Sequence, residues 1–206
     1  WIDTGDIPAS LYAPGDPGYF ILLHEIGHAL GLKHPFESTF LNPTTLDPAF
    51  DTVSYTVMSY HLYEDLEIGD YGLTVYPTTP MPIDIEAIQY LYGAKPYNSG
   101  DTVYAYNEKS DYYETIYDTG GNDTIVWNSD RQFAIIDLIG GNWSSLGNAV
   151  YTFDRQGQYV KTDIYNVVIF NTTVIENATG GASDDELYGN EVANRLEGGG
   201  GHDIVW

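Results

Sequence analysis

Apolar residues in the first part of the chain recur with the period of an α-helix. In the stretch YFILLHEIGHALGL they follow a spacing of about 3.6 residues, which gives a helix one buried face. These positions are Ile21, Leu22, Ile26, Ala29 and Leu30. Gly31 follows at once, and glycine most readily adopts the left-handed conformation that ends a helix. The pattern therefore predicts a helix that ends near Gly31.

From about residue 95 to residue 175 the apolar residues fall in short segments between clusters of Gly, Asn, Asp and Ser. The segments DTVYAY, DTIVW, FAIIDLI and NVVIFN are rich in Tyr, Val, Ile and Thr. These residue types favour β-strands, and the intervening clusters favour turns. This region is therefore predicted to be all-β, with many short strands.

The end of the chain repeats every nine residues, as GGASDDELY, GNEVANRLE and GGGGHDIVW. Each unit places one large apolar residue at the same position, namely Leu187, Leu196 and Val205. A flexible glycine-rich linker has no need of such a residue. The repeat instead predicts a solenoid whose apolar positions point inward.

These patterns predict two domains, at residues 1–94 and 95–206. A chain of 206 residues with 43% hydrophobic content can bury one substantial core or two modest ones. Four of the five histidines and both methionines lie before residue 95. The first domain is therefore expected to carry the functional site.

The charge and the cysteine content exclude several classes of function. The chain has 30 Asp and Glu against 7 Lys and Arg, a formal net charge of -23, which repels nucleic acid and anionic membranes and attracts cations. We therefore expect no nucleic-acid partner and no membrane partner, and no apolar run approaches the roughly 18 residues of a transmembrane helix. The absence of cysteine leaves histidines and carboxylates as the metal ligands.

The predicted helix carries HEIGHALGLKH, which places histidines at positions 24, 28 and 34. His24 and His28 lie one turn apart on the same face and can bind one zinc ion, and the chain can return His34 after the helix ends. Three nitrogen ligands leave one position open, which is typical of a catalytic zinc site. Glu25 lies beside them as a candidate general base. Core or solvated histidines are the usual interpretation of a lone His, but so many specified positions in register argue against it.

The motif, together with SYTVMSY at residues 54–60, resembles the signature of the metzincin metalloproteases. The similarity is closest to their serralysin branch, because the motif runs through Pro35, the turn reads VMSY, and IDIEAIQYLYGA at 83–94 resembles the helix that closes their catalytic domain. The resemblance implies that Met58 packs under the zinc site without binding it. It also implies that Tyr60 can ligate zinc and swing away to stabilise the transition state.

The nonapeptides independently resemble the GGxGxDxUx repeats, called RTX repeats, of calcium-binding β-rolls. Carbonyl groups of glycine turns and aspartate carboxylates are the hard oxygen ligands that Ca²⁺ prefers. Stacking of alternate repeats, together with the resemblance, implies three calcium sites. The first uses Asn98, Gly100, Thr102, Asp118, Gly120 and Asp123; the second Gly121, Asp123, Val174 and Glu176; the third Gly180, Ala182, Asp185, Gly198, Gly200 and Asp203. Asn194 stands where the middle repeat needs Asp, so that turn should bind calcium poorly or not at all.

The resemblance implies an α+β fold, in which the C-terminal part of a metzincin zinc-protease domain precedes an all-β parallel β-roll or β-sandwich domain. The implied function is a secreted, extracellular, zinc-dependent endopeptidase that cleaves proteins and peptides and is stabilised by calcium. Two alternatives stay open, namely a calcium-binding scaffold or adhesin segment with a vestigial zinc site, and a non-catalytic piece of a nicked protease. The intact ligand set with Glu25 argues against decay.

Only 23 residues precede His24, whereas the resemblance places a twisted sheet ahead of this helix. Trp1 and Ile2 are expected to end one of its last strands. Without that sheet the apolar face of the helix would be partly uncovered, at about 1.5 to 3 kcal/mol per large side chain. We therefore expect a longer protein in which an N-terminal sheet segment packs on the helix.

Overall fold

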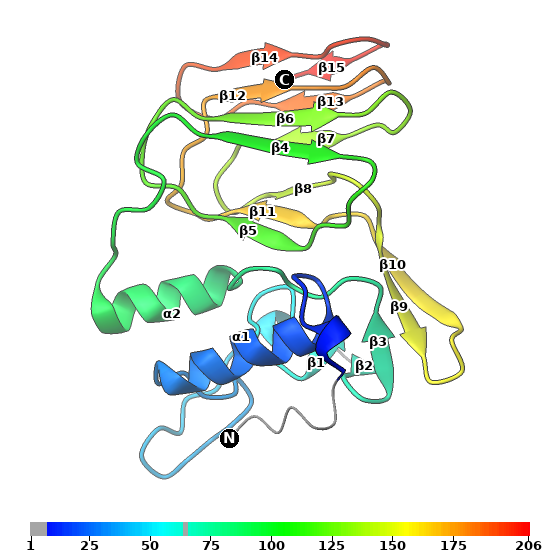
Figure 1. Ribbon diagram of the computed structural model, residues 1–206. Helices are drawn as coiled ribbons and strands as arrows, with labels where there is room; N and C mark the ends of the chain where they lie inside the picture. Colours follow the sequence, from blue (N-terminus) through cyan, green and yellow to red (C-terminus); the bar gives the residue numbers. More distant parts are fainter. Residues whose placement is uncertain (1–7, 64–65) are drawn as a thin grey trace. The chain divides into compact units, whose positions relative to one another are not determined.

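The computed structural model describes residues 8–63 and 66–206, so the expected strand end at Trp1 and Ile2 lies outside the described residues. The chain forms two compact units (Figure 1). The first comprises Trp1–Ala94 with Val150–Thr162, and the second comprises Lys95–Ala149 with Asp163–Trp206.

Two α-helices dominate the first unit. α1 (Pro17–Ala29) begins with proline in its first turn, where no backbone N–H is needed. Its C-cap is Leu30, which is followed by Gly31 with a φ of +93°. The predicted helix is therefore confirmed. Its predicted buried face is not, because none of the five apolar positions is buried and the buried residues of α1 are Gly18, Phe20, His24 and Gly27. α2 (Pro82–Tyr92) lies in the second predicted helical stretch and also begins with proline. The 3₁₀ turns η1 (Ala9–Leu11) and η2 (Pro48–Phe50) and the short strands β1 (His61–Tyr63), β2 (Leu66–Glu67) and β3 (Tyr71–Leu73) complete this part of the chain.

A hairpin from the later part of the chain belongs to the first unit. β9 (Val150–Asp154) pairs antiparallel with β3, and β10 (Tyr159–Asp163) extends the sheet in the order β10-β9-β3. Arg155 in the hairpin loop also forms an ion pair with Asp70. The division at residue 94 assigns this hairpin to the second domain. It lies in the first unit because β9 supplies the hydrogen-bonding partner for β3.

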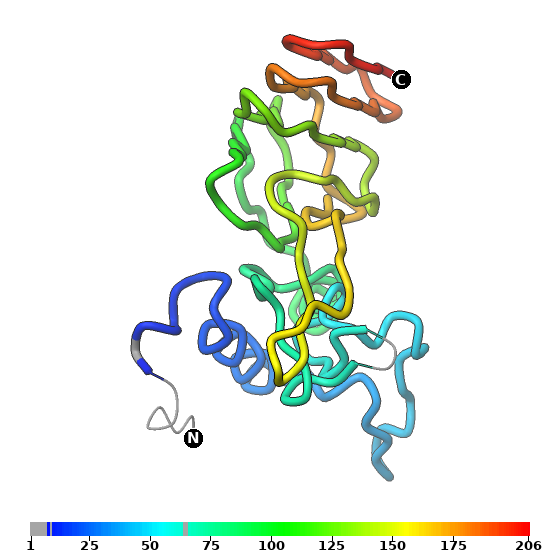
Figure 2. The backbone as a smooth tube through the Cα atoms, turned by 90° about the vertical axis from the view of Figure 1, so that its right-hand side faces the viewer, coloured from blue at the N-terminus to red at the C-terminus, as the bar shows by residue number. Residues whose placement is uncertain are grey.

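The second unit consists of short strands in three sheets. One sheet has the order β14-β12-β6-β4 and another the order β15-β13-β7, and every pair in both is parallel, whereas the third, β5-β11-β8, is mixed. The strands are β4 (Val103–Asn107), β5 (Glu114–Ile116), β6 (Thr124–Asn128), β7 (Ile135–Asp137), β8 (Trp143–Ser144), β11 (Val167–Ile169), β12 (Asn177–Thr179), β13 (Glu186–Tyr188), β14 (Arg195–Glu197) and β15 (Ile204–Val205). Figure 2 shows the end of the chain wound into stacked coils. The all-β region and the parallel roll predicted from the repeat are confirmed.

The core of this roll contains the apolar residues that the nonapeptide pattern points inward. Leu187 is fully buried beside Ile125 and Ile136, and Leu196 is partly buried against the same cluster. Val205 differs, because the residue is 50% exposed. The expectation of a buried Val205 is wrong because β15 is an edge strand, which pairs only with β13 among the described strands.

Within the described ranges, no helix has both the length and the apolar character needed to cross a lipid bilayer.

Candidate functional site

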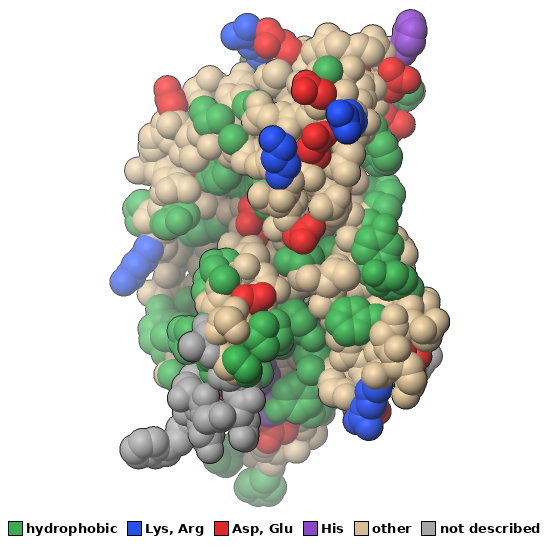
Figure 3. Space-filling view, turned by 45° about the vertical axis from the view of Figure 1, so that its right-hand side comes forward, with side chains coloured by type: hydrophobic (Ala, Val, Ile, Leu, Met, Phe, Trp, Pro, Cys, Tyr) green, Lys and Arg blue, Asp and Glu red, His purple; other side chains and the backbone are tan. Residues whose placement is uncertain are grey.

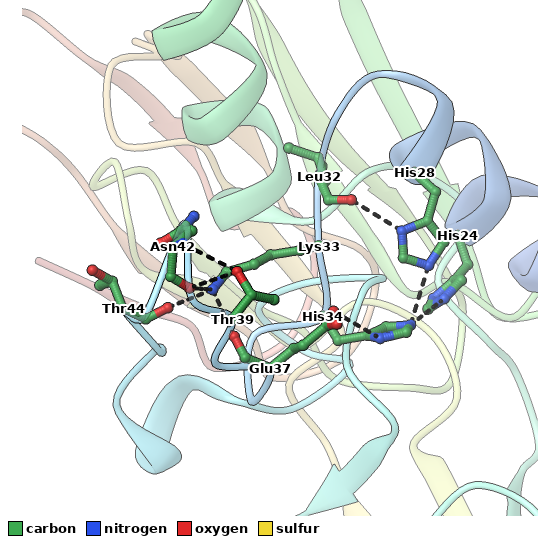
Figure 4. Close-up of polar contacts among 9 residues, drawn as sticks. All are labelled: His24, His28, Leu32, Lys33, His34, Glu37, Thr39, Asn42 and Thr44. Atoms are coloured by element: carbon green, nitrogen blue, oxygen red, sulfur yellow. Dashed lines mark hydrogen bonds and ion pairs between the residues drawn. The ribbon is translucent and has the colours of Figure 1, made fainter.

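Three imidazole rings converge at the C-terminal end of α1. His24 and His28 project from successive turns of the helix, and the reversal at Gly31 brings His34 back to face them (Figure 4). The Nε2 atom of His34 lies 3.2 Å from Nε2 of His24 and 3.1 Å from Nε2 of His28. Candidate ligand atoms of the three residues all lie within 4.8 Å of one another.

Backbone carbonyls fix the orientation of two of these rings. Nδ1 of His24 lies 2.8 Å from the carbonyl oxygen of Val57, and Nδ1 of His28 lies 3.0 Å from that of Leu32. Because a carbonyl oxygen can only accept, each Nδ1 carries the proton and each Nε2 presents its lone pair.

The convergent nitrogens fit a tetrahedral zinc ion. Zinc–nitrogen bonds of about 2.0–2.1 Å place the nitrogens of a tetrahedral site about 3.3 Å apart, close to the spacing found here. Burial lowers the pKa of both His24 and His34 below the usual value, and the charge of His28 lowers both further. The neutral form that binds a metal is thereby favoured.

Tyr60 and Glu25 flank the histidines, and Met58 supports the helix. The ring of Tyr60 lies with its centroid 4.6 Å from that of His34 and 5.5 Å from that of His24, and 43% of the residue is exposed. Glu25 is exposed on α1 next to His24. Met58 is buried, and its Sδ occupies the space that a Cβ on Gly27 of α1 would need.

Two further residues near His34 were not anticipated from the sequence. Phe36 stacks on the His34 ring at 5.2 Å and 5° between planes, and it also contacts Tyr60 at 5.3 Å. Nζ of Lys33 donates to the carbonyl oxygens of Glu37, Asn42 and Thr44 at 2.6, 3.0 and 2.6 Å (Figure 4). Lys33 thus closes the loop that follows His34.

In the second unit, Asp123 lies at the meeting point of the first two expected calcium sites. It is fully buried, its Oδ1 accepts from the Thr102 N–H at 2.8 Å, and its own N–H donates to Oε2 of Glu176 at 2.7 Å. Oδ2 has no hydrogen-bond partner among the described residues. Burial raises the pKa of Asp123, and the carboxylates of Asp118 and Glu176 raise it further. A buried acid without a neutralising partner fits a cation site.

The other expected ligands of these two sites differ in burial and in backbone conformation. Asp118 is buried and accepts from the Gly120 N–H at 2.9 Å. A Cβ on Gly121 would lie 2.7 Å from the carbonyl oxygen of Gly100. Asn98 has a positive φ of 49°. Val174 is exposed and offers the expected site only its carbonyl group.

The turns of the third expected site stack on each other. The N–H of Asp185 donates to Oδ1 of Asp203 at 3.0 Å, and the Gly181 N–H donates to Oδ2 of Asp185 at 2.6 Å. The structure therefore brings one set of expected ligands opposite the other: Gly180, Ala182 and Asp185 on the first turn, and Gly198, Gly200 and Asp203 on the second.

The middle repeat closes its turn with an amide. Oδ1 of Asn194 accepts from the Asn190 N–H at 2.9 Å, and its Nδ2 donates to the Glu176 carbonyl at 3.0 Å and to Oδ1 of Asn190 at 2.9 Å. The side-chain N–H groups of Asn194 thus satisfy acceptors that a cation would otherwise engage.

Two histidines and a glutamate on one helix with a third histidine in the loop after it, joined in one chain to a parallel β-roll, are typical of a metalloprotease. The sequence is 37% identical over 199 residues to a serralysin of Proteus mirabilis and 37% identical over 204 residues to the metalloprotease AprA of Pseudomonas entomophila (strain L48). It is 35% identical over 193 residues to serralysin G of Dickeya chrysanthemi. The chain therefore belongs to the serralysin family of metalloproteases.

These alignments cover 88%, 89% and 85% of this chain, in the same order, but 37%, 39% and 37% of the relatives. The chain thus spans less than two fifths of the length of each of these curated relatives. No protein-family model matches the sequence.

Proposed function

We propose that this chain provides the zinc-binding and calcium-binding parts of a secreted endopeptidase of the serralysin type. The first unit would then be the C-terminal part of a metzincin catalytic domain. The observation that carries the proposal is the convergence of three Nε2 atoms, two of which are oriented by backbone carbonyls. Secretion is proposed from the kinship and from the use of calcium, which is abundant outside cells.

His24, His28 and His34 would hold the zinc ion, with Tyr60 as a further ligand in the resting state. The ion would polarise the scissile carbonyl of a protein or peptide substrate and acidify the attacking water. Glu25 would accept the proton of that water and deliver it to the leaving amine. Tyr60 would donate its hydroxyl proton to the developing oxyanion. The position of its ring beside His24 and His34 supports this role.

We propose calcium at the three sites of the roll, with the ligands given above. The support differs between the sites. Oδ2 of buried Asp123, which has no hydrogen-bond partner within the part of the chain that the structure describes, supports the first two sites, and the stacking of Asp185 on Asp203 supports the third. Calcium would stabilise the roll by neutralising carboxylates that its turns bring together.

The outer face of α1 supports a further partner, namely another segment of the same protease. Leu22 is 37% exposed and Ile26 is 47% exposed, and Ala29 is exposed on the same helix. Hydrophobic side chains also gather on the face of the first unit shown in Figure 3. An N-terminal sheet segment of the same protein would cover this stripe.

The test combines metal analysis with casein hydrolysis by the full protein. We expect one zinc per chain and cleavage that chelation abolishes and added zinc restores. Glu25→Gln should keep the zinc and lower kcat/KM by about 10²–10⁴-fold, the usual contribution of a general base. Glu86→Gln, which removes an exposed acid from α2, is the matched control and should leave activity unchanged. Near-normal cleavage by Glu25→Gln would exclude the proposed mechanism.

A further inference from the structure

The first turn of α2 carries a carboxylate that is almost completely buried. Asp84 is 2% exposed, and its two oxygens accept three hydrogen bonds. Oδ1 accepts from the Thr56 hydroxyl at 2.6 Å, and Oδ2 accepts from the Val57 N–H at 2.8 Å and from the Met81 N–H at 2.9 Å. Asp84 therefore joins the start of α2 to the turn that contains Met58.

The same turn holds a zinc-ligand candidate. The carbonyl oxygen of Val57 accepts from Nδ1 of His24 at 2.8 Å, so Val57 is bonded to Asp84 through its N–H and to His24 through its carbonyl group. Thr56 strengthens the connection, because its Oγ1 also accepts from the Met58 N–H at 3.1 Å. All of these residues are buried. Water is therefore a poor substitute for any bond in the series.

We propose that Asp84 is a positioning residue for zinc binding, which acts through the peptide groups of Val57 to hold His24 with its Nε2 directed at the metal. The inference rests on the proposed zinc function and adds a residue outside the HExxH motif and the methionine turn. Asp84 contacts neither zinc nor substrate in this scheme.

The cost of the arrangement argues that the carboxylate serves more than packing. Burial raises the pKa of Asp84 to about 6, while the bonds from Thr56, Val57 and Met81 lower it. The group is nevertheless ionised at neutral pH, as an acceptor for three donors must be. An apolar side chain of similar size would avoid the desolvation cost. An apolar side chain at position 84 would, however, leave the Val57 N–H without its acceptor, and the peptide groups of Val57 that orient His24 would be free to tilt.

The experiment measures the zinc dissociation constant by competition with a chelating dye at pH 7.5. The proteins are the full protein and its Asp84→Ala, Asp84→Asn and Leu73→Ala variants. Asp84→Ala removes all three acceptor bonds and should raise the Kd by about 10- to 100-fold, the usual effect of losing a partner behind a metal ligand. Asp84→Asn keeps an oxygen for the Val57 and Met81 donors, so it should recover most of the affinity.

Leu73→Ala is the stability control, because Leu73 is buried in β3 and makes no hydrogen bond to the series. It should lower the melting temperature and leave the Kd within about 2-fold. Equal zinc affinity for the Ala variant and the unmodified protein would overturn the positioning role alone. A Kd that rises in every variant in proportion to its loss of stability would also overturn the positioning role. If Asp84→Ala does not fold, the Asp84→Asn variant decides the question through its zinc affinity and the proton resonance of the His24 Nδ1–H group. An unchanged affinity with an unchanged resonance supports the positioning role. Loss of the resonance without loss of affinity overturns the positioning role. Failure of the unmodified protein to bind zinc would overturn the proposed function as well.

Discussion

The packing of Met58 against α1 predicts the effect of adding one methyl group to the zinc-binding helix. Gly27 is buried and has a helical backbone. It faces Met58 with no room for a Cβ, since the Sδ of Met58 fills the position of that Cβ and the Cε of Met58 lies 3.5 Å from it. Gly27→Ala should gain about 1 kcal/mol from helix propensity. It should lose about 1–3 kcal/mol from overpacking against a side chain that can shift only in part.

We therefore expect Gly27→Ala to be neutral or destabilising by up to about 2 kcal/mol, whereas an exposed glycine in a helix would be stabilised by the same change. Met58→Ala alone should cost about 2–5 kcal/mol, because it leaves a cavity. In the double variant the alanine methyl group enters that cavity and the clash is absent. The double variant should then be about 1–3 kcal/mol more stable than the sum of the single effects predicts.

The coupling energy is the difference between the effect of the double variant and the sum of the single effects. Urea denaturation of the unmodified protein, the two single variants and the double variant, with zinc and calcium present, measures it directly. Gly27→Ala combined with Leu73→Ala is the matched control, and these two effects should add within about 0.5 kcal/mol. Additivity of Gly27→Ala and Met58→Ala within the same margin would refute the contact between α1 and the methionine turn.

Four other predictions concern titration, calcium removal, calcium content and turnover. Because the folded-state pKa of Asp84 is about 6 and its ordinary value is 3.8, the contribution of Asp84 to stability is present below pH 4 and is lost as the pH rises through 6. The free energy of unfolding of the native protein relative to Asp84→Asn should therefore fall by about 2 kcal/mol from pH 4 to pH 7, since part of the contribution is already lost at pH 4. A flat difference in urea melts would contradict this. Calcium chelation should abolish the β-type circular dichroism of the second unit, and an unchanged spectrum would contradict the proposed role of calcium in the roll. Asn194→Asp should raise the calcium content by one ion per chain, and an unchanged calcium content would contradict the proposed effect of Asn194. Tyr60→Phe should lower kcat far more than it raises KM, and unchanged turnover would return Tyr60 to a packing role.

Local patterns were sufficient to predict α1 and the roll. The apolar period in α1 and the glycine after it depend on neighbours within a few residues, so the sequence displays them directly. The same is true of Leu187, whose inward position follows from the nine-residue repeat. A single division at residue 94 does not separate the hairpin at 150–162 from the second unit, because strand propensity does not reveal that β9 pairs with β3, about 80 residues earlier in the chain.

The candidate site shows the same division between local and distant contacts. The three histidines are close in sequence, and their spacing alone predicts that they meet. Asp84 had a sequence signal, since an acid in the first turn of a helix is expected to cap it. Its contact with Val57 spans 27 residues and has no local pattern. Phe36 lies two residues after His34, but only the path of the loop shows that it stacks on that ring.

The two units prepare for their metals in different ways. Around the histidines, the carbonyl groups of Val57 and Leu32 already orient the ring nitrogens, so the arrangement needs little reorganisation when zinc binds. In the roll, Oδ2 of buried Asp123 has no hydrogen-bond partner among the described residues, and the turn of Asp185 is stacked on that of Asp203, so the carboxylate charge stays unbalanced until a cation enters. Removal of zinc should therefore leave the first unit largely folded, because its supporting bonds do not involve the metal. Removal of calcium should unfold the roll, because there the cation neutralises carboxylates that the turns bring together. The repeat with Asn194 in place of the aspartate is consistent with this reasoning. There the side-chain N–H groups of Asn194 donate hydrogen bonds within the turn, and no carboxylate charge needs a cation.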